Sequence, residues 1–113
     1  MNDKDINSGR AAERVRKLRE LNGYSRNEAA KLLHISPEHL RHIESGKGYS
    51  GDLLERMSEL YHVSMDFISK GVSTPDATDM ERKAAIAMAV ADVEEAQRNL
   101  AMAATRLKAF LKS

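Results

Sequence analysis

Two helix-start signals lie close together in the first half of the chain, and they constrain its fold more than any other feature. Ser25 is followed three residues later by Glu28, which is the pattern of a capping box. Ser36 is followed directly by Pro37, which favours the first turn of a helix. Because the two serines are eleven residues apart, each signal has room for only a short helix. Residues 25–46 are therefore predicted to form two short helices joined by a tight corner.

The apolar residues of this predicted pair form one stripe on each helix. They recur at helical spacing through residues 25–46, at Ala30, Leu33, Ile35, Leu40 and Ile43. Two short helices that each bury one stripe do not fold alone, so the flanking segments have to complete the core. The outward face of the second helix, which we take as the candidate working surface, carries Glu38, His39, Arg41 and His42.

Three more helices are predicted in the first 71 residues, because a serine precedes each of three further apolar patterns. These N-cap serines are Ser8, Ser50 and Ser64. The helices are expected to end at Asn22-Gly23, His62-Val63 and Gly71. Their apolar faces carry Ala12, Val15, Leu18, Leu21, Leu54, Met57, Leu60, Tyr61, Met65, Phe67 and Ile68. The other face of the first helix, which is either solvated or part of the working surface, carries Arg10, Arg14, Arg16 and Lys17. Residues 1–8 are expected to be flexible.

A loop with the sequence GKGYSG follows the second helix of the pair. Its glycines and serine favour an irregular, flexible backbone. Lys47 and Tyr49 lie on this loop without an apolar neighbour to bury them, so we expect both side chains to be exposed.

The end of the chain is predicted to form one long helix over residues 79–112, after a polar, proline-containing linker over residues 72–78. Thr78 and Glu81 have the spacing of a capping box at its start. At about 1.5 Å per residue the helix is a rod of about 50 Å, which a small domain does not cover. We therefore expect it to pair with a second helix through Ile86, Val90, Val93, Gln97, Leu100, Ala104, Leu107 and Leu111.

Gln97 is the polar residue of this stripe. A buried amide at such a position fixes the register of two paired helices, whereas an amide at the edge of the interface is simply solvated. The sequence leaves both possibilities open, as it leaves open whether the paired helices run parallel or antiparallel.

Composition excludes several classes of protein. The 113 residues are enough for one modest domain with an added element, and the absence of cysteine excludes disulfides, thiolate metal sites and a cysteine nucleophile. No apolar run approaches the roughly 20 residues of a membrane span, and the polar start of the chain lacks the apolar core of a signal peptide. We therefore expect a cytoplasmic protein.

The basic residues are concentrated in the first half, although the net charge is only +1. Residues 8–48 contain nine Lys or Arg against five Glu, whereas residues 71–113 contain six basic and six acidic residues. A basic patch of this kind attracts polyanions such as nucleic acid. The two halves are therefore expected to do different jobs.

Residues 9–71 resemble the phage-repressor and Cro type of helix-turn-helix domain, often called the XRE family. The resemblance is carried by RVRKLRELNGYSRNEAAKLL, HIS, LRHIESGKG and HVSMDFISKG, which follow one another in the order and spacing of that family. It implies an all-α fold in which a five-helix, lambda-repressor-like domain precedes the long C-terminal dimerisation helix. In that family the second helix of the pair lies in the major groove, and dimers bind palindromic half-sites about one helical turn apart.

The resemblance also implies a role for each matching residue. Glu38, Arg41 and His42 occupy base-reading positions, although Glu38 equally suits the positive N-terminal end of its helix without any contact to DNA. The implied DNA-binding residues are Arg26, Asn27, Ser36, Glu38, His39, Arg41, His42, Lys47 and Tyr49. Arg26 takes the phosphate-contacting place, with a simple solvated arginine as the alternative. Arg19 and Glu44 match a pair that holds the recognition helix in position.

The chain departs from the family pattern at three points. His34 replaces the usual glycine of the corner and has to take a left-handed backbone conformation, which is uncommon for histidine. His62 replaces a second glycine, before Val63. The loop after the recognition helix is one residue shorter than expected and has fewer basic residues, so we expect moderate affinity for phosphate.

No pattern in the chain supports catalysis or a metal site. There is no Ser/His/Asp constellation, no phosphate-cradling glycine loop and no pair of inward carboxylates. His34, His39 and His42 are near one another in sequence, but no cysteine joins them and no carboxylate ligand is clearly placed. We therefore predict no enzyme, no metal and no cofactor.

Two hypotheses follow for the function. The first is a sequence-specific DNA-binding transcriptional regulator, a repressor that binds double-stranded DNA as a homodimer. The second is a protein-interaction or antitoxin-like module, whose C-terminal helix binds a partner protein.

Overall fold

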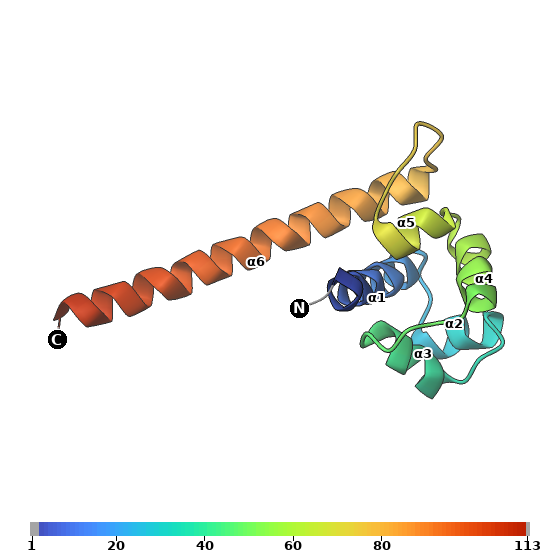
Figure 1. Ribbon diagram of the computed structural model, residues 1–113, viewed down its shortest axis with the longest axis horizontal. Helices are drawn as coiled ribbons and strands as arrows, with labels where there is room; N and C mark the ends of the chain where they lie inside the picture. The colour runs from blue at the N-terminus through green and yellow to red at the C-terminus, as the bar shows by residue number, and fades with distance from the viewer. Residues whose placement is uncertain (1–2, 113) are drawn as a thin grey trace.

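The computed structural model describes the backbone of residues 3–112 and the side chains of residues 10–112. Within this range the chain is all-helical, as predicted (Figure 1). The helices are α1 (Asp3–Leu21), α2 (Arg26–Leu32), α3 (Pro37–Glu44), α4 (Gly51–Tyr61), α5 (Met65–Lys70) and α6 (Asp79–Lys112). Helices α1 to α5 form a small domain, and α6 begins against this domain and then extends well past it.

Serine N-caps begin four of the helices, which confirms the sequence prediction for each. The hydroxyl of the serine accepts a hydrogen bond from the backbone N–H three residues later at Ser25, Ser36, Ser50 and Ser64. At Ser25 the box is complete, because the Glu28 carboxylate also accepts a bond from the Ser25 backbone N–H at 3.0 Å. These caps fix where α2 to α5 begin.

The prediction that Ser8 caps the first helix is wrong, because α1 already begins at Asp3. Extending an existing helix by a few residues is far easier than starting one. Residues 3–8 are therefore helical, and residues 1 and 2 lie outside the described part of the chain.

The core of the domain surrounds α1. Its largest fully buried side chains include Val15, Leu18, Leu33, Leu40, Ile43, Met57, Tyr61, Phe67 and Ile68. On α4 the buried stripe contains Leu53, which was not predicted, whereas Leu54 and Leu60 are only partly buried. Leu53, Met57 and Tyr61 follow one another at intervals of four residues and form one row along the helix. This row faces the core, and Leu54 and Leu60, which were predicted to face it, lie on either side of the row. Leu21 and Met65, also predicted to face inward, are exposed.

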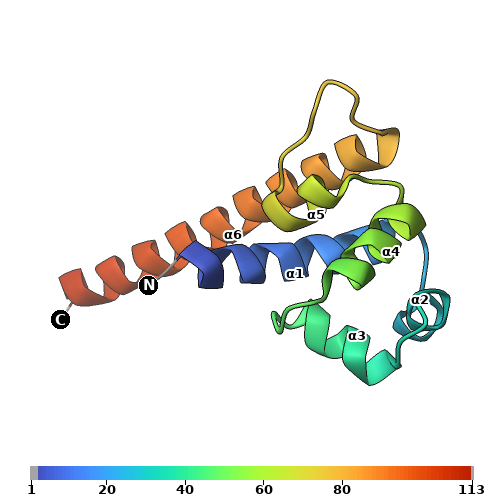
Figure 2. The same ribbon diagram turned by 45° about the vertical axis from the view of Figure 1, so that its right-hand side comes forward.

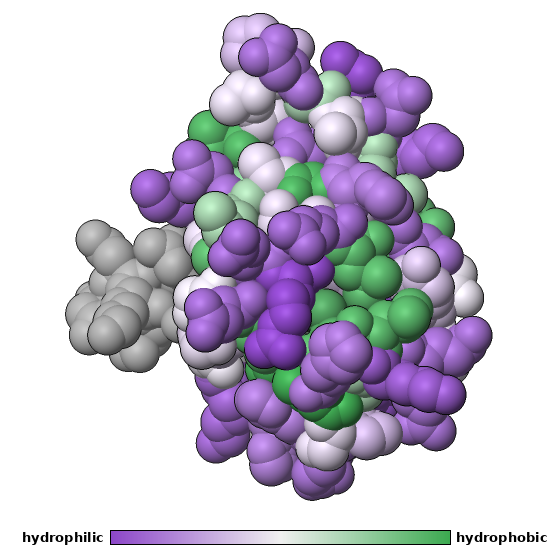
Figure 3. All heavy atoms as spheres, turned by 90° about the vertical axis from the view of Figure 1, so that its right-hand side faces the viewer, coloured by the Kyte–Doolittle hydropathy of each residue, from purple (hydrophilic) through white to green (hydrophobic). Residues whose placement is uncertain are grey.

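The surface of the domain is mainly polar around a small apolar region. Figure 3 views the end of the molecule opposite the free part of α6, and hydrophilic side chains there surround hydrophobic ones near the centre. The residues of the core cluster are themselves no more than 5% exposed, and partly buried apolar residues such as Leu54 and Leu60 pack around them.

Two histidines take a left-handed backbone conformation at the ends of helices. His34, at the corner between α2 and α3, has a φ of 60°, which confirms the prediction for that position. His62, the residue that ends α4, has the same φ. The chain therefore keeps the sharp corners of the family pattern although it lacks glycine there, at a modest cost in backbone strain.

The start of α6 is held by a network that differs from the predicted capping box. Thr78 Oγ1 accepts a hydrogen bond from the Glu81 backbone N–H at 3.0 Å, as expected, and donates one to the His62 carbonyl at 2.6 Å. The Glu81 carboxylate does not close the box on Thr78. It is buried and accepts a bond from the Ser64 backbone N–H at 2.5 Å instead. This side chain therefore connects the start of α6 to the start of α5.

Helix α6 buries one side against the domain and exposes the other. Glu81 and Ala84 are buried, and Arg10 on α1 forms an ion pair with Asp92. The predicted pairing residues Ile86, Val90, Val93, Leu100, Leu107 and Leu111 are between 50% and 73% exposed. The apolar stripe is therefore open to solvent over its whole length, including the part that lies beside the domain.

Candidate nucleic-acid interface

The recognition helix candidate, α3, presents its polar face to the solvent. Leu40 and Ile43 are buried in the core, and this fixes the rotation of the helix about its axis. The exposed side chains on the other face are Glu38, His39, Arg41 and His42. The four residues expected to form the working surface therefore lie together on one exposed helix face.

Three of these side chains form a network on the surface of α3. The guanidinium of Arg41 donates two hydrogen bonds to the Glu38 carboxylate, one of them from Nε at 3.2 Å. His42 Nε2 lies 3.2 Å from Glu38 Oε1. The hydrogen bond from Arg41 lowers the pKa of Glu38, and the same bond raises the pKa of Arg41. Glu38 therefore contacts both Arg41 and His42. The Arg41 guanidinium has to release this carboxylate before the same donors can reach a base.

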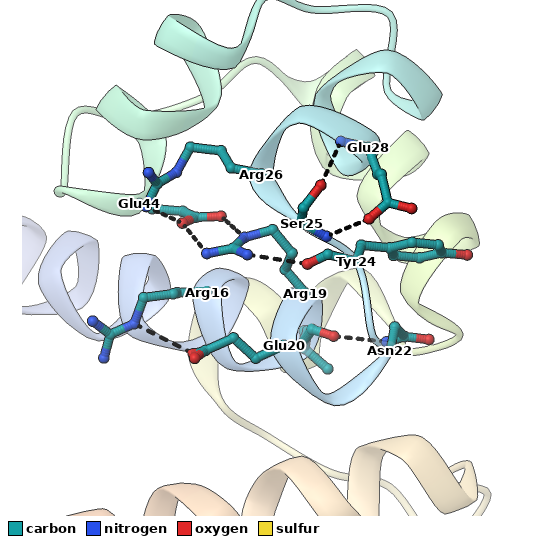
Figure 4. A network of polar contacts seen from close by, with 10 residues as sticks. Arg16, Arg19, Glu20, Asn22, Tyr24, Ser25, Arg26, Glu28 and Glu44 are labelled. Atoms are coloured by element: carbon teal, nitrogen blue, oxygen red, sulfur yellow. Dashed lines mark hydrogen bonds and ion pairs between the residues drawn. The ribbon is translucent and has the colours of Figure 1, made fainter.

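Arg19 and Glu44, the expected structural pair, lie in direct contact (Figure 4). Arg19 donates from Nε to Glu44 Oε2 at 2.7 Å and from Nη2 to Oε1 at 3.0 Å. A third bond runs from Arg19 Nη1 to the Tyr24 carbonyl at 3.1 Å. The hydrogen bond to Glu44 raises the pKa of Arg19. Because Glu44 is the last residue of α3, this pair fastens the C-terminal end of α3 to α1.

Arg26 shares the same carboxylate. Its Nη2 lies 3.3 Å from Glu44 Oε1, and its side chain is 40% exposed. Its Nε is buried and has no hydrogen-bond partner among the described residues. Arg26 therefore forms an ion pair at the start of α2, while part of its side chain stays open to solvent. A carboxylate at the C-terminal end of a helix is unfavourable for the helix dipole, and two guanidinium groups offset this at Glu44.

The loop after α3 places its two candidate residues differently. Lys47 is exposed, and its backbone N–H donates to the His42 carbonyl at 3.0 Å. Tyr49 is half-buried against the core, with its hydroxyl 3.4 Å from Ser69 Oγ. The prediction that Tyr49 has nothing apolar to bury it is wrong, because the loop folds back and brings the ring against residues that are distant in sequence.

The remaining candidates border the same surface. Ser36 and Asn27 are both exposed, near the starts of α3 and α2 respectively. The hydroxyl of Ser36 is engaged, because it accepts the capping bond from the His39 backbone N–H at 3.0 Å. Asn27 keeps an exposed side chain in the first turn of α2.

Arg14 is a structural residue that the sequence did not reveal. It was placed on the polar face of the first helix, but only 8% of the residue is exposed. Its Nε donates to the Ile68 carbonyl at 2.8 Å and its Nη2 to the Ser69 carbonyl at 3.0 Å, and burial lowers its pKa. Arg14 therefore satisfies carbonyl groups at the end of α5. No local signal distinguishes it from its exposed neighbours, because the partner carbonyls lie more than fifty residues away.

The described residues show no other obvious chemical site. No group of three or more His, Cys, Asp or Glu side chains within this part of the chain could hold a metal ion. No helix among the described residues is long and apolar enough to cross a membrane. A shallow cavity of about 220 Å³ lies between α1, the end of α5 and α6, and its lining includes Arg10, Arg14, Phe67 and Met88.

Comparison with known proteins identifies the domain. A helix-turn-helix family model matches residues 15–68, from the middle of α1 to α5. Residues 15–68 belong to the XRE-type helix-turn-helix family. Comparisons with curated proteins and with solved structures found no match. The family match supports a DNA-binding regulator, and it covers all the elements that position the exposed face of α3.

Proposed function

We propose that this helix-turn-helix protein is a sequence-specific transcriptional regulator, a repressor that binds a palindromic operator as a dimer. The observation that carries the proposal is the exposed face of α3, where Glu38, Arg41 and His42 lie together. Arginine matches the two acceptors of guanine in the major groove, and a carboxylate accepts from the N4 amino group of cytosine. The Arg19–Glu44 ion pair supports this role, because it keeps α3 in a fixed position.

Phosphate contacts are proposed for the residues around this face. Arg26 and Asn27 lie at the start of α2, where backbone N–H groups also point outward, and Lys47 lies on the loop after α3. Ser36 and His39 are proposed to lie near phosphate or at the edge of the groove. The Tyr49 hydroxyl is proposed to contact phosphate only when its hydrogen bond with Ser69 is broken.

The dimer is proposed to form through the apolar stripe of α6 and a second copy of the same helix. The stripe residues are separated alternately by four and three positions from Ile86 to Leu111, and none of the eight is charged. An average spacing of about 3.5 is the repeat of two helices that wind around each other. A second copy of the chain carries the same uncharged stripe at the same spacing. We therefore propose that α6 of a second copy packs against this stripe.

Selection from random DNA tests the proposal. The full chain is incubated with random duplexes at several salt concentrations, and bound duplexes are sequenced. Enrichment of one motif with two-fold symmetric halves is expected, with affinity that falls steeply as salt rises. Failure to enrich any motif at low salt would contradict sequence-specific binding.

A second candidate function is a protein-interaction or antitoxin-like module, and the exposed stripe of α6 is the observation that favours it. Light scattering separates the two candidates. A homodimer that is lost when the chain is truncated at Gly71 supports the regulator, whereas a monomer that associates only with another protein supports the module. We propose no catalytic activity and no cofactor for either, and a regulator of this kind works in the cytoplasm, where it meets DNA.

A further inference from the structure

Two rows of residues border the apolar stripe of α6, one on each side. The row that directly follows Ile86 and every seventh residue after it consists of Ala87, Glu94, Ala101 and Lys108. The row that directly precedes Val90 and every seventh residue after it consists of Ala89, Ala96, Ala103 and Phe110. When two helices pair through an apolar stripe, residues in these rows flank the contact, and their charges select the orientation of the partner. One row therefore carries two charges, and the other carries none.

Glu94 and Lys108, the two charged residues of these rows, are both exposed. Neither of them forms an ion pair with another residue in the described part of the chain. They lie fourteen residues apart, which is about four turns, so they do not reach each other within one helix. A second copy of α6 presents a positive charge opposite Glu94 and a negative charge opposite Lys108 only when it runs in the opposite direction.

The stripe itself is open on the side of α6 that faces away from the domain. Glu81 and Ala84 are buried against the domain, whereas Ile86 and Val90, about half a turn around the helix, are 64% and 50% exposed. Figure 2 shows α6 passing beside α1 and then extending beyond the domain. A second helix therefore has room along the stripe from Ile86 to Leu111.

We infer that two copies of α6 pair in antiparallel orientation, with the two-fold axis between residues 98 and 99. This arrangement rests on the proposed function and deepens it, because it assigns the direction and the register of the partner helix. In this register all eight stripe residues are covered by stripe residues of the second copy. The facing pairs, each of which occurs twice by symmetry, are Ile86 with Leu111, Val90 with Leu107, Val93 with Ala104 and Gln97 with Leu100.

The charged row supplies the first reason for this orientation. Lys108 of the second copy lies level with residue 89, which is five residues or about 7.5 Å along the axis from Glu94. Side chains on a helix lean toward its N-terminus, so the two side chains of an antiparallel pair lean toward each other across this distance. The Glu94 carboxylate and the Lys108 ammonium group therefore meet at both ends of the dimer.

The uncharged row fits the same register. Phe110 of the second copy lies about 3 Å along the axis from Ala89, so a large ring packs over a small side chain. Ala96 likewise lies beside Ala103 of the second copy, and two methyl groups at this position let the helices approach closely.

A parallel pair would bring neither charge a partner. In a parallel pair each row faces the other row of the partner at an offset of five residues. Glu94 then lies opposite Ala89, and Lys108 lies opposite Ala103. Because charge complementarity is available in only one orientation, the antiparallel pair is favoured.

Gln97 selects the register rather than the direction. Since the axis lies between residues 98 and 99, the two Gln97 side chains occupy the two central layers, about 4.5 Å apart along the axis. Each amide both donates and accepts, so the two satisfy each other within the apolar contact. Another antiparallel register, with the axis at residue 102, separates the two amides by about 15 Å and leaves Ile86 and Val90 without a facing residue.

The pairing also sets how far apart the two domains lie along the helices. The contacts of α6 with its own domain, through Glu81, Ala84 and Asp92, are centred near residue 86, about 12 residues from the axis. The two domains are therefore displaced along the pair by about 38 Å, close to the roughly 34–36 Å between half-sites one helical turn apart. This displacement agrees with the half-site spacing of the palindromic operator proposed above.

Cysteine cross-linking tests the direction, because the chain has no cysteine of its own. Full-length Ile86→Cys and Leu111→Cys are each purified alone and also co-expressed, and all samples are oxidised with copper phenanthroline. In the antiparallel pair two copies of the same residue lie about 37 Å apart, far beyond the Cα separation of roughly 4–7 Å that a disulfide spans. We expect no disulfide dimer from either variant alone and cross-linking of up to about half of the chains in the co-expressed sample, where mixed dimers form.

Met102→Cys, at an exposed position on the other side of the same helix, is the matched control and is expected to give no disulfide dimer. Disulfide dimers from Leu111→Cys alone would overturn the inference, because only a parallel pair brings the two copies of residue 111 together. Light scattering on the wild-type chain separates the two failures. A monomer overturns the proposed dimer and the antiparallel pairing with it, whereas a dimer whose variants give parallel cross-links overturns the pairing alone.

Charge reversal provides a second test that leaves the stripe intact. Glu94→Lys and Lys108→Glu are each expected to raise the Kd of dimerisation by about 3- to 10-fold, since each creates two like-charge contacts. The double variant restores opposite charges and is expected to return within about twofold of the wild type. Sedimentation equilibrium at low salt measures all four chains. Further weakening in the double variant, or no effect of either single substitution, would contradict the antiparallel contact.

Discussion

Arg10 and Asp92, which are 82 residues apart in the chain, join α1 to α6 through two parallel hydrogen bonds of 2.8 and 3.0 Å. This fork-to-fork geometry constrains how α6 lies against α1, because a bidentate arginine–carboxylate pair constrains orientation as well as distance. The hydrogen bond from Arg10 lowers the pKa of Asp92 below its ordinary value of 3.8. The orientation of the long helix therefore depends in part on a pair that is exposed to acid and salt.

Asp92→Asn is expected to reduce the loss of stability at low pH. Because the folded-state pKa of Asp92 is lowered, its carboxylate stabilises the fold above the unfolded pKa of about 4 and loses this effect as the pH falls through the folded value. Urea unfolding at pH 7 and at pH 3 checks the difference. Asp76→Asn in the linker is the control and should follow the wild type, and an Asp92 variant with the wild-type acid response would contradict the prediction.

Gly71→Ala is expected to lower the unfolding free energy by about 1–3 kcal/mol, since it strains the backbone and displaces a buried cation. Gly71 has a φ of 72°, and a Cβ there would lie 2.9 Å from Arg14 Nη1. Gly48→Ala, with a φ of 78° and open space around it, separates the backbone contribution from the clash. Equal losses in both variants, measured by urea unfolding, would show that the clash with Arg14 adds nothing to the backbone strain.

Tyr61→Phe is expected to leave stability unchanged or to raise it by up to about 1 kcal/mol, because it removes a buried polar group that lacks a bond. The Tyr61 hydroxyl is buried and has no hydrogen-bond partner among the described residues. Burial is also the main reason why the pKa of Tyr61 is raised well above its ordinary value. Thermal and urea unfolding measure the change, and a loss greater than about 1 kcal/mol would show that the hydroxyl is satisfied in solution.

Arg19→Met is expected to cost about 3 kcal/mol of stability, because it leaves the carboxylate of Glu44 buried with only one cation. The Glu44 side chain is 2% exposed, and two of its three hydrogen bonds come from Arg19. The double variant Arg19→Met with Glu44→Leu should recover part of this loss, since no unpaired charge stays buried. A double variant as unstable as the sum of the two single variants would mean that the pair does not act as a unit.

Arg41→Ala and Arg26→Ala are expected to affect DNA binding in different ways. Loss of Arg41 should weaken the preferred site by roughly 10- to 100-fold and relax selection at one base pair, because a base contact is lost. Loss of Arg26 should weaken all sites alike and reduce the salt dependence by about one phosphate contact. Fluorescence anisotropy on matched and substituted duplexes, at several salt concentrations, measures both. An Arg41 variant with unchanged base preference would show that Arg41 does not contact a base.

The starts and ends of the short helices were predictable because their signals are local. A serine cap with its N–H partner three residues later is contained within one turn, so Ser25, Ser36, Ser50 and Ser64 fix the helix starts without reference to the rest of the fold. The left-handed corner at His34 was predicted on another ground, because the family pattern usually has a glycine at this position. The prediction that Ser8 begins the first helix was wrong because the helix continues through this residue, and no nearby residue stops such an extension.

Long-range contacts decided the rest of the candidate site. Tyr49 packs against the core and Arg14 reaches the end of α5, and both partners lie in other parts of the sequence. Glu81 has the spacing of a capping box, yet its carboxylate bonds to Ser64 because α5 lies beside the start of α6. The spacing of residues along the chain does not show which distant segments come into contact. It could not, therefore, predict the partners of Tyr49, Arg14 and Glu81.

The sequence by itself determined an all-helical chain with a pair of short capped helices and a long helix that carries an apolar stripe, because amphipathic period and capping are properties of neighbouring residues. Only the tertiary structure decided which way the exposed face of α3 and the stripe of α6 point. That relation depends on how α1 lies between α3 and α6, with Arg19 bound on one side and Arg10 on the other. The direction of a surface follows from packing between segments that are distant in sequence, and no local pattern contains that packing.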